Sequence, residues 1–511
     1  MAIFLGIDVG TSGTKAVLID ETGTVLATAL GGHEPSTPQP GYSEQNPEDW
    51  WRSTLEAIKN ATAKAGISPS RIDAIGPTGQ MHGLVALDKE GTPLRPAILW
   101  NDQRSAPQCA EYEKTIGRER LIEETGNRLL PGFTAPKLLW MREHEPDLFK
   151  NIHTVLLPKD YIRYRFSGAM GMDVSDASGT SVFNCGKRCW SEEILNAMDL
   201  PRSWWPDTYE SQEVIAQVQE SAAKETGIRE GVPIVAGAGD QAASAVGMGL
   251  VDSSVIGTTL GTSGVVFAAC DTWKTTPDGS LHAFCHAVPG KWHLMGVLLS
   301  AAGSVKWFRD TIAPDIAEAA ELKGGNGYQA LDQLAAHTPP GAEGLYFLPY
   351  LSGERTPHPD PNARGCWIGL STRHNRSHMM RAVVEGVTHG LKECLDLIAQ
   401  TGIDAHAVRI SGGGAMSSFW RQLCADTFNV PVRTTTTTEG TAYGAALLAA
   451  VGGGAFTSIE DACSNAVRED LTATPGPEHA ALQAHHEMYC TLYPTLKSTF
   501  TAMAAVNQGD I

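Results

Sequence analysis

With 511 residues, the chain exceeds what one hydrophobic core usually supports, so we expect two large domains, residues 1–248 and 249–511. A formal net charge of −18, without a long cluster of Lys and Arg, argues against nucleic acid or an anionic membrane as a partner. No apolar stretch approaches the ~20 residues that span a bilayer, no leader sequence precedes the first predicted strand, and the cysteines lack zinc-site spacing, so we expect a cytoplasmic protein with reduced thiols.

The first predicted elements are two strands, 4–9 and 15–20, joined by a turn of Gly10, Thr11, Ser12 and Gly13. A third strand is expected at 23–29. Glycines let the turn reach positive φ and leave successive N–H groups and short hydroxyls facing an oxyanion. We expect this turn and Lys15 to bind phosphate, and the alternative is an ordinary polar hairpin turn.

Strand and helix then alternate, which favours mixed α/β architecture. The segment 47–65 places its large apolar residues on one helical face, and 72–76 is predicted as a strand. That strand leads into a loop bracketed by glycines and containing Met81 and His82. Polar groups at the end of a strand are well placed to meet a ligand. For His82 alone, a structural histidine is the alternative.

A second polar strand end follows at 97–99, where an apolar strand stops at Trp100, Asn101 and Asp102. An aromatic face beside an amide and a carboxylate suits a polyol, which presents both C–H groups and hydroxyls. A turn formed by Asn and Asp is the alternative interpretation.

Near the midpoint, a buried strand that begins at Val232 runs into the Gly-x-Gly-Asp segment 237–240, and a helix of small residues follows from Ala242. Asp is a preferred N-cap residue, which is the structural alternative for Asp240. A carboxylate held ionised by a helix dipole is also a competent proton acceptor at neutral pH.

The second half repeats the plan of the first. The strands at 255–260 and 265–267 flank a second Gly-Thr-Ser-Gly turn that begins at Gly261 and Thr262. Further on, the strand at 410 enters a glycine run containing Gly413, and a helix starts at Ser417. Such a junction lets a flat or anionic ligand lie against the backbone. Two equal turns in matching contexts predict two related halves.

Two helices are expected near the C-terminus. The segment 439–446 is rich in Gly and Ala, which predicts close packing against another element, and a hinge is compatible with it. The segment 480–511 is predicted as one helix with a loose tail, and we assign it no chemistry.

Together these motifs resemble the actin, Hsp70 and sugar-kinase superfamily. Within it, the segments 132–141 and 365–385 resemble the two signature segments of the FGGY carbohydrate kinases. The implied fold is α/β, with two RNase H-like domains around a central cleft, the first binding sugar and the second binding nucleotide. The resemblance also implies closure of the domains to bring the reacting groups together and to remove water.

Three segments narrow the resemblance to the members that phosphorylate xylulose: 80–83, 99–102 and 348–357. Glycerol kinases carry an Arg and a Glu in the loop that corresponds to 79–82, so their absence puts glycerol in doubt. The residues at 77–78 depart from the usual aliphatic residue and serine, which alters how the loop is presented.

The resemblance implies transfer of a phosphoryl group from ATP to the terminal hydroxyl of D-xylulose. Asp240 would accept the hydroxyl proton, and Asp8 would hold Mg2+ through water. The other site residues divide by ligand into a sugar set of Met81, His82, Trp100, Asn101, Asp102 and Gln241, and an ATP set of Gly10, Thr11, Ser12, Lys15, Gly261, Thr262, Gly413 and Ser417.

Several alternatives remain open at this point. The acceptor could be ribulose, another ketose or a polyol. A nonenzymatic protein driven by ATP, like an actin or Hsp70 relative, is a different class, and a homodimer is compatible with the sequence.

Overall fold

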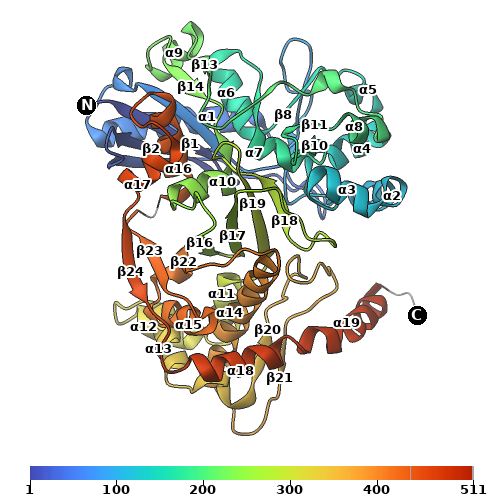
Figure 1. Cartoon of the computed structure of the whole chain (residues 1–511), viewed down its shortest axis with the longest axis vertical. Helices are drawn as coiled ribbons and strands as arrows, with labels where there is room; N and C mark the ends of the chain where they lie inside the picture. Colours follow the sequence, from blue (N-terminus) through green and yellow to red (C-terminus); the bar gives the residue numbers. More distant parts are fainter. Residues whose placement is uncertain (438, 509–511) are drawn as a thin grey trace. The chain divides into compact units, whose positions relative to one another are not determined.

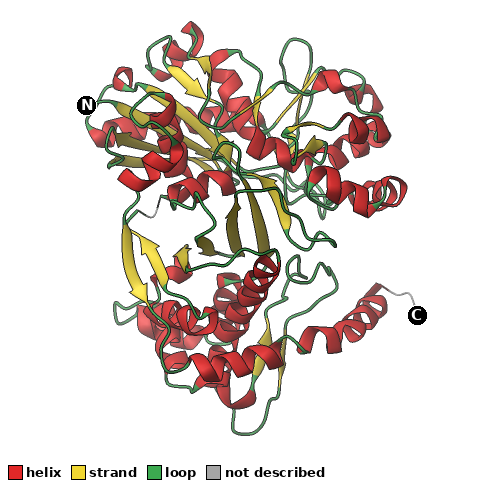
Figure 2. Ribbon diagram, in the orientation of Figure 1, coloured by secondary structure: helices red, strands yellow, loops and turns green. Residues whose placement is uncertain are grey.

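A computed structural model describes residues 1–437 and 439–508, without the side chains of 471–472 and 507–508. The chain forms two compact units. Unit 1 comprises Met1–Val251, Ala269–His293 and Glu439–Arg468, and unit 2 comprises Asp252–Ala268, Leu294–Thr438 and Glu469–Ile511. The end of the first segment lies close to the boundary expected at residue 248, and two later segments join unit 1. Both units mix strands with helices, as Figure 2 shows.

Unit 1 is organised around one mixed sheet with the strand order β13-β14-β5-β1-β2-β3, and β15 also pairs with β5. Blue and green strands lie side by side here in Figure 1, because distant segments pair. The strands are β1 (Ile3–Val9), β2 (Gly13–Asp20), β3 (Val25–Gly32), β5 (Ala74–Gly79), β13 (Val214–Gln217), β14 (Pro233–Val235) and β15 (Ala238–Gly239). The predicted meander β1-β2-β3 is thereby confirmed.

Helix α1 (Pro47–Ala65) forms over the residues expected from the sequence. Asn46 caps its start by accepting a hydrogen bond from Glu48 N at 3.1 Å. Gly66 ends it in the left-handed conformation with φ 67°, which glycine adopts without strain. The indole rings of Trp50 and Trp51 are buried against the sheet. Burial of such side chains contributes about 2–3 kcal/mol each and holds α1 on the sheet.

The two faces of the sheet are covered by different helices. Leu5 and Ile7 pack in one cluster with α1, whereas Phe4 packs in another with α10 (Asp240–Gly247) and α16 (Gly440–Gly452). Successive side chains of a strand point to opposite faces, so even-numbered positions of β1 face α10 and α16.

Glycines bring α16 into direct contact with the strands. A Cβ on Gly6 would lie 2.0 Å from Ala442 O, and one on Gly76 would lie 2.0 Å from Ala445 O. The same holds between helices, where a Cβ on Gly444 would lie 1.8 Å from Ala243 O. The close packing expected of the 439–446 segment is confirmed.

The rest of unit 1 consists of short strand pairs and further helices. The pairs are β4 (Glu44–Gln45) with β7 (Ala97–Ile98), β6 (Val85–Leu87) with β8 (Thr154–Leu156), β9 (Met172–Asp173) with β12 (Thr208–Tyr209), and β10 (Phe183–Asn184) with β11 (Cys189–Trp190). The helices are α2 (Ala106–Ile116), α3 (Arg118–Thr125), α4 (Thr134–His144), α5 (Pro146–Phe149), α6 (Pro158–Ser167), α7 (Val174–Ala177), α8 (Glu192–Ala197), α9 (Glu220–Thr226) and α17 (Ile459–Ala466), and β18 (His282–Cys285) also belongs here.

Unit 2 has its own sheet, which contains the second hairpin. Its strands run in the order β19-β17-β16-β22-β23-β24, namely β19 (Trp292–Leu298), β17 (Gly264–Cys270), β16 (Val255–Leu260), β22 (Ala407–Ser411), β23 (Val432–Thr435) and β24 (Glu469–Ala473). A separate pair joins β20 (Tyr346–Leu348) and β21 (Cys366–Ile368). The helices are α11 (Ala302–Thr311), α12 (Pro314–Glu321), α13 (Gly327–Ala336), α14 (Arg376–Gln400), α15 (Ser418–Phe428), α18 (His479–Tyr489) and α19 (Leu492–Gln508).

The prediction for the C-terminal segment is wrong in one respect. We expected one helix from residue 480, and the structure has α18 and α19 separated at Cys490 and Thr491. Pro494 explains the break, because proline is tolerated in the first turn of a helix and not in its interior. A loose tail was also expected at the end of this segment, where residues 509–511 lie outside the described residues.

Candidate functional site

Two half-buried carboxylates, Asp8 of β1 and Asp240 of α10, lie on the same side of the unit 1 sheet. Asp8 follows Phe4 and Gly6 at an even position of β1, so it lies on the face covered by α10 and α16. Thr78 of β5 pairs with both Asp8 and Ala238 of β15, and all three strands run parallel. Asp240 therefore starts α10 at the strand edge where Asp8 lies.

The two carboxylates share one electrostatic environment. Burial raises the pKa of Asp240 to about 7, and the charge of Asp8 raises it in addition. Burial likewise raises the pKa of Asp8 to about 6, against the opposing effect of the Lys15 charge. A carboxyl group with a pKa near neutrality exchanges a proton readily at the pH of the cell.

Asp240 begins its helix as the first helical residue. Gly239 is the N-cap, and α10 therefore starts two residues before the expected Ala242. Gly239 has no side chain that could cap the helix, and the carboxylate of Asp240 accepts hydrogen bonds from Gln241. The N-cap alternative for Asp240 is therefore not what this geometry shows.

Lys15 is held by Glu439, the residue that precedes α16. Its Nζ donates to Glu439 Oε2 at 3.0 Å. Lys15 and Asp8 are opposite each other in the antiparallel register of β1 and β2. The cation is thus fixed beside Asp8 on the same sheet face.

The first Gly-Thr-Ser-Gly turn is tied to both loops that we expected to bind sugar. Thr11 Oγ1 donates to Gln80 Oε1 at 3.3 Å and accepts from Trp100 Nε1 at 3.1 Å. Gln45 Nε2 donates to Thr11 O at 2.6 Å, and Gly10 N donates to Gly13 O at 3.0 Å to close the turn. Gly10, Thr11 and Ser12 are therefore brought next to Trp100.

His82 is held in a strained and well-defined position. Its φ is 71°, which is uncommon for a residue other than glycine. Its Nδ1 donates to Gly179 O at 2.8 Å, and its ring stacks on Phe133 at 4.4 Å between centroids. Lys137 Nζ donates to His82 O at 2.9 Å and to Gly132 O at 2.8 Å. Met81 is buried beside Gly239, whose Cβ would lie 3.0 Å from Met81 Cγ.

Sequence reasoning missed three of these partners. Phe133 and Lys137 belong to the segment 132–141, which we used only as a family signature, so a signal was present. Gly179 lies 97 residues from its partner His82, and no local pattern indicates such a contact.

Asp102 has structural partners in this loop. It is fully buried, with Arg104 Nη2 donating to its Oδ2 at 2.8 Å and Ser43 N donating to the same oxygen at 2.6 Å. Trp100 and Asn101 before it are exposed. The ion pair thus anchors the strand end that presents these two side chains.

In unit 2, a cavity of about 550 Å³ contains all four residues that we expected there. Its lining includes Gly261, Thr262, Gly303, Asp332, Gly413 and Ser417. The N-terminus of α11 meets the second turn, because Ala302 N donates to Gly261 O at 2.8 Å and Gly303 N donates to Thr262 O at 3.0 Å. A helix N-terminus beside a glycine turn favours phosphate.

The lining of this cavity also includes polar groups suited to a nucleoside. Ser417 Oγ caps α15 by accepting from Trp420 N at 3.0 Å. The pKa of the Asp332 carboxyl is raised by burial, and a hydrogen bond from Ser417 opposes that rise. Asn326 and Gln329 also line the cavity. None of these α13 side chains was singled out from the sequence, because nothing local separates them from an exposed helical face.

The carboxylate pair fits a hard cation. Among the described residues, no group of three or more His, Cys, Asp or Glu side chains is arranged to hold a metal ion. Asp8 and Asp240 nevertheless offer oxygen donors, and Thr78 Oγ1 beside them is buried without a hydrogen-bond partner in the described chain. Mg2+ is commonly held by one or two carboxylates together with substrate phosphates and water, so this donor set suits it.

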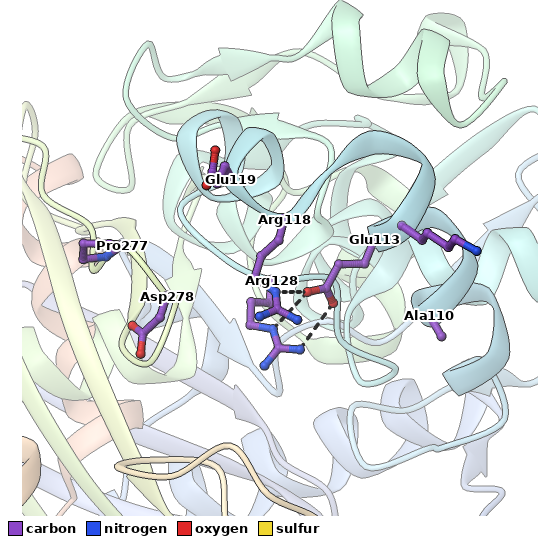
Figure 3. A pocket seen from close by; sticks show the side chains of 8 residues that line it. Ala110, Glu113, Arg118, Glu119, Arg128, Pro277 and Asp278 are labelled. Atoms are coloured by element: carbon purple, nitrogen blue, oxygen red, sulfur yellow. Dashed lines mark hydrogen bonds and ion pairs between the residues drawn. The ribbon is translucent and has the colours of Figure 1, made fainter.

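Another groove in unit 1, of about 710 Å³, is lined by none of the expected residues. Figure 3 shows Arg118 and Arg128 directed at the same carboxylate, Glu113. Asp278 and Glu119 add further negative charge to the lining. The guanidinium groups are therefore already paired, and the groove offers little attraction for an anion.

The ten cysteines form no disulfide within the described residues, and seven of them are buried, as expected of mostly core thiols. No helix within 1–437 and 439–508 combines the length and apolar character needed to cross a membrane.

Comparisons with known proteins agree over nearly the whole chain. The models of the N-terminal and C-terminal domains of the FGGY family of carbohydrate kinases match residues 3–247 and 257–453. The chain is 41% identical to the xylulose kinase of Escherichia coli over 97% of this chain and 99% of that protein. The structure matches the ligand-bound xylulose kinase of Lactobacillus acidophilus with a TM-score of 0.92 at 28% identity, covering 98% and 100% of the two chains. A Brucella ovis relative gives a TM-score of 0.89 at 37% identity, covering 97% and 100%.

Proposed function

The chain belongs to the FGGY family of carbohydrate kinases, and from this premise we propose that it transfers the γ-phosphoryl group of ATP to the terminal hydroxyl of D-xylulose. The products are D-xylulose 5-phosphate and ADP. Support for the sugar comes from the relatives named xylulose kinase and from the Met81-His82 and Trp100-Asn101 loops. A cytoplasmic location belongs to the same proposal, because ATP is available there.

The observation that carries the mechanism is the half-buried pair of Asp8 and Asp240, in which the charge of Asp8 acts on Asp240. Asp240 accepts the proton of the sugar hydroxyl as its oxygen bonds to the γ-phosphorus and the bond to the bridging oxygen of ADP breaks. Its pKa of about 7 lets an ionised fraction act as base at neutral pH. Asp8 is the residue that would hold Mg2+, through water, and the ion supplies positive charge to the phosphates.

Sugar binding is assigned to unit 1. His82 and Met81 are fixed by stacking and burial, so they present a preorganised surface to the sugar. Trp100 supplies an apolar face, and Asn101 and Gln241 supply hydrogen bonds. We assign Asp102 a positioning role, because its buried ion pair with Arg104 anchors the loop that presents Trp100.

Phosphate binding is assigned to the two glycine turns, and nucleoside binding to other residues of the cavity in unit 2. In unit 1, Gly10, Thr11 and Ser12 offer turn amides and hydroxyls, and Lys15 offers a charge held by Glu439. In unit 2, the cavity residues are assigned by chemistry, Gly261 and Thr262 to phosphate at the α11 N-terminus, and Gly413 and Ser417 to the nucleoside.

An ADP-release assay with a panel of sugars tests the proposal. We expect the highest kcat/KM with D-xylulose, lower values with D-ribulose and D-fructose, and little turnover with glycerol. Asp240→Asn serves as the control and should lose kcat about 10²-fold or more while sugar binding is retained. A higher kcat/KM for another acceptor would replace D-xylulose. ADP release that no sugar stimulates would remove the kinase assignment itself.

A further inference from the structure

A cluster of charged side chains lies fully buried in unit 1. It is hydrogen-bonded to the short segment 236–239 that leads to Asp240. Lys159 Nζ of α6 lies 2.6 Å from Asp160 Oδ1, 2.8 Å from Asp173 Oδ1 and 3.3 Å from Asp176 Oδ2. Arg163 Nη1 lies 3.0 Å from Asp160 Oδ1. Burial and the charges of Asp160 and Asp173 raise the pKa of Asp176 well above its usual range, and the charge of Lys159 opposes that rise. Two cations therefore face three carboxyl groups.

The cluster reaches Gly239, the residue before Asp240, through one hydroxyl group. Ser175 Oγ donates to Asp173 Oδ2 and accepts from Gly239 N at 3.0 Å. Ser211 Oγ donates to the same Asp173 oxygen at 3.2 Å. A hydroxyl group that donates a hydrogen bond to a carboxylate becomes a better acceptor, so the hydrogen bond from Gly239 N to Ser175 Oγ is directed and strong.

The cluster also holds the other end of this short segment. Arg163 Nη1 donates to Ala236 O at 2.6 Å. Between Ala236 and Gly239 the chain passes through Gly237 with φ 82°. The segment is therefore built from flexible small residues and clamped at both ends by the same buried ions.

Asp240 needs such a clamp, because its surroundings push against it. Burial and the charge of Asp8 both oppose its ionised form, and the segment before it gains little rigidity from its own residues. A buried ion cluster adds little net stability compared with apolar residues, whereas it directs hydrogen bonds precisely. A displacement of a reacting group by about 1 Å can cost about 10²-fold in rate.

We propose that Ser175, held by Asp173 and Lys159, is a positioning residue for the phosphoryl transfer. Its hydroxyl fixes Gly239 N and thereby sets the carboxylate of Asp240 against the sugar hydroxyl. The inference rests on the proposed function of Asp240 as the proton acceptor, and it assigns a catalytic consequence to residues that do not touch either substrate.

The test compares Ser175→Ala with Ser191→Ala in the full chain. Ser191 is a matched control, because its buried hydroxyl donates to Glu124 Oε2 at 2.7 Å and accepts from Ile194 N at 3.3 Å, and neither partner belongs to the segment 236–240. Ser175→Ala should lower kcat about 10- to 100-fold with the KM for xylulose and for ATP within about 2-fold. Ser191→Ala should leave kcat within about 2-fold, and Ser175→Thr, which keeps the hydroxyl, should restore most of the rate.

Each outcome distinguishes the inference from the function on which it rests. Equal kcat for Ser175→Ala and Ser191→Ala, while Asp240→Asn is inactive, would overturn the positioning role and leave Asp240 as base. Normal turnover by Asp240→Asn would overturn the proposed function first. If Ser175→Ala does not fold, Asp173→Asn keeps the shape of the cluster and weakens its acceptor, and it should show the same fall in kcat at unchanged KM. An unchanged kcat for that variant also refutes the positioning role.

Discussion

Replacing Asp240 by Asn should stabilise the protein while it removes activity. The folded chain raises the pKa of Asp240 from 3.8 to about 7, so the folded state binds this proton more tightly than the unfolded state. The resulting stability is fully present below pH 3.8 and is lost as the pH rises toward 7. At about 1.4 kcal/mol per pKa unit, the loss amounts to about 4 kcal/mol at pH 8. Asn is neutral at every pH and avoids this loss.

Denaturant unfolding of the ligand-free protein with EDTA, from pH 4 to pH 8.5, measures the difference. Asp240→Asn should match the unaltered protein within about 1 kcal/mol at pH 4 and exceed it by up to about 4 kcal/mol at pH 8. The matched control is Asp102→Asn, the same change at a fully buried aspartate, which leaves Arg104 with Glu44 as its remaining carboxylate and should destabilise by about 1–3 kcal/mol. A destabilised Asp240→Asn at pH 8 would refute the reasoning, because it would mean that the ionised carboxylate is satisfied in the folded state.

Three further substitutions test individual parts of the site. Asp8→Ala should lower kcat/KM for Mg-ATP by about 10²-fold, and calorimetry with each ligand separately should show xylulose binding retained; a selective loss of sugar affinity would contradict the assignment. A Cβ at residue 179 would lie 2.4 Å from His82 Nδ1, so Gly179→Ala should raise the KM for xylulose about tenfold by displacing the ring, and an unchanged KM would argue against His82 as a sugar contact. A Cβ at residue 413 meets no described atom within 4 Å, so Gly413→Ala should leave the melting temperature unchanged and raise the KM for ATP about tenfold; unaltered ATP kinetics would move the nucleoside elsewhere.

Local patterns were sufficient for the elements that depend on local chemistry. The apolar strands around each Gly-Thr-Ser-Gly turn, and the cap, periodicity and terminal glycine of α1, are properties of adjacent residues. The prediction of one C-terminal helix failed although Pro494 was visible, because we gave too little weight to where proline is tolerated in a helix.

The site shows the same division. The sequence alone identified the candidate site residues Asp8, Asp240, His82 and Trp100 and their positions near strand ends. These residues and their motifs were sufficient to show a resemblance to a known family. The sequence could not show whether Asp102 contacts a ligand or forms an ion pair, because the packing of distant loops determines its partners.

The sequence by itself determined two α/β halves with matching turns, the helix and strand types, and the chemistry available at each strand end, because hydrophobic periodicity and glycine placement act over a few residues. Only the tertiary structure decided which groups meet. The pKa of Asp240 depends on burial and on Asp8, and the hydrogen bond from Gly239 to Ser175 joins residues 64 positions apart. Such contacts arise when a sheet with parallel strands gathers distant segments at one edge, and the electrostatics of the site follow from that packing.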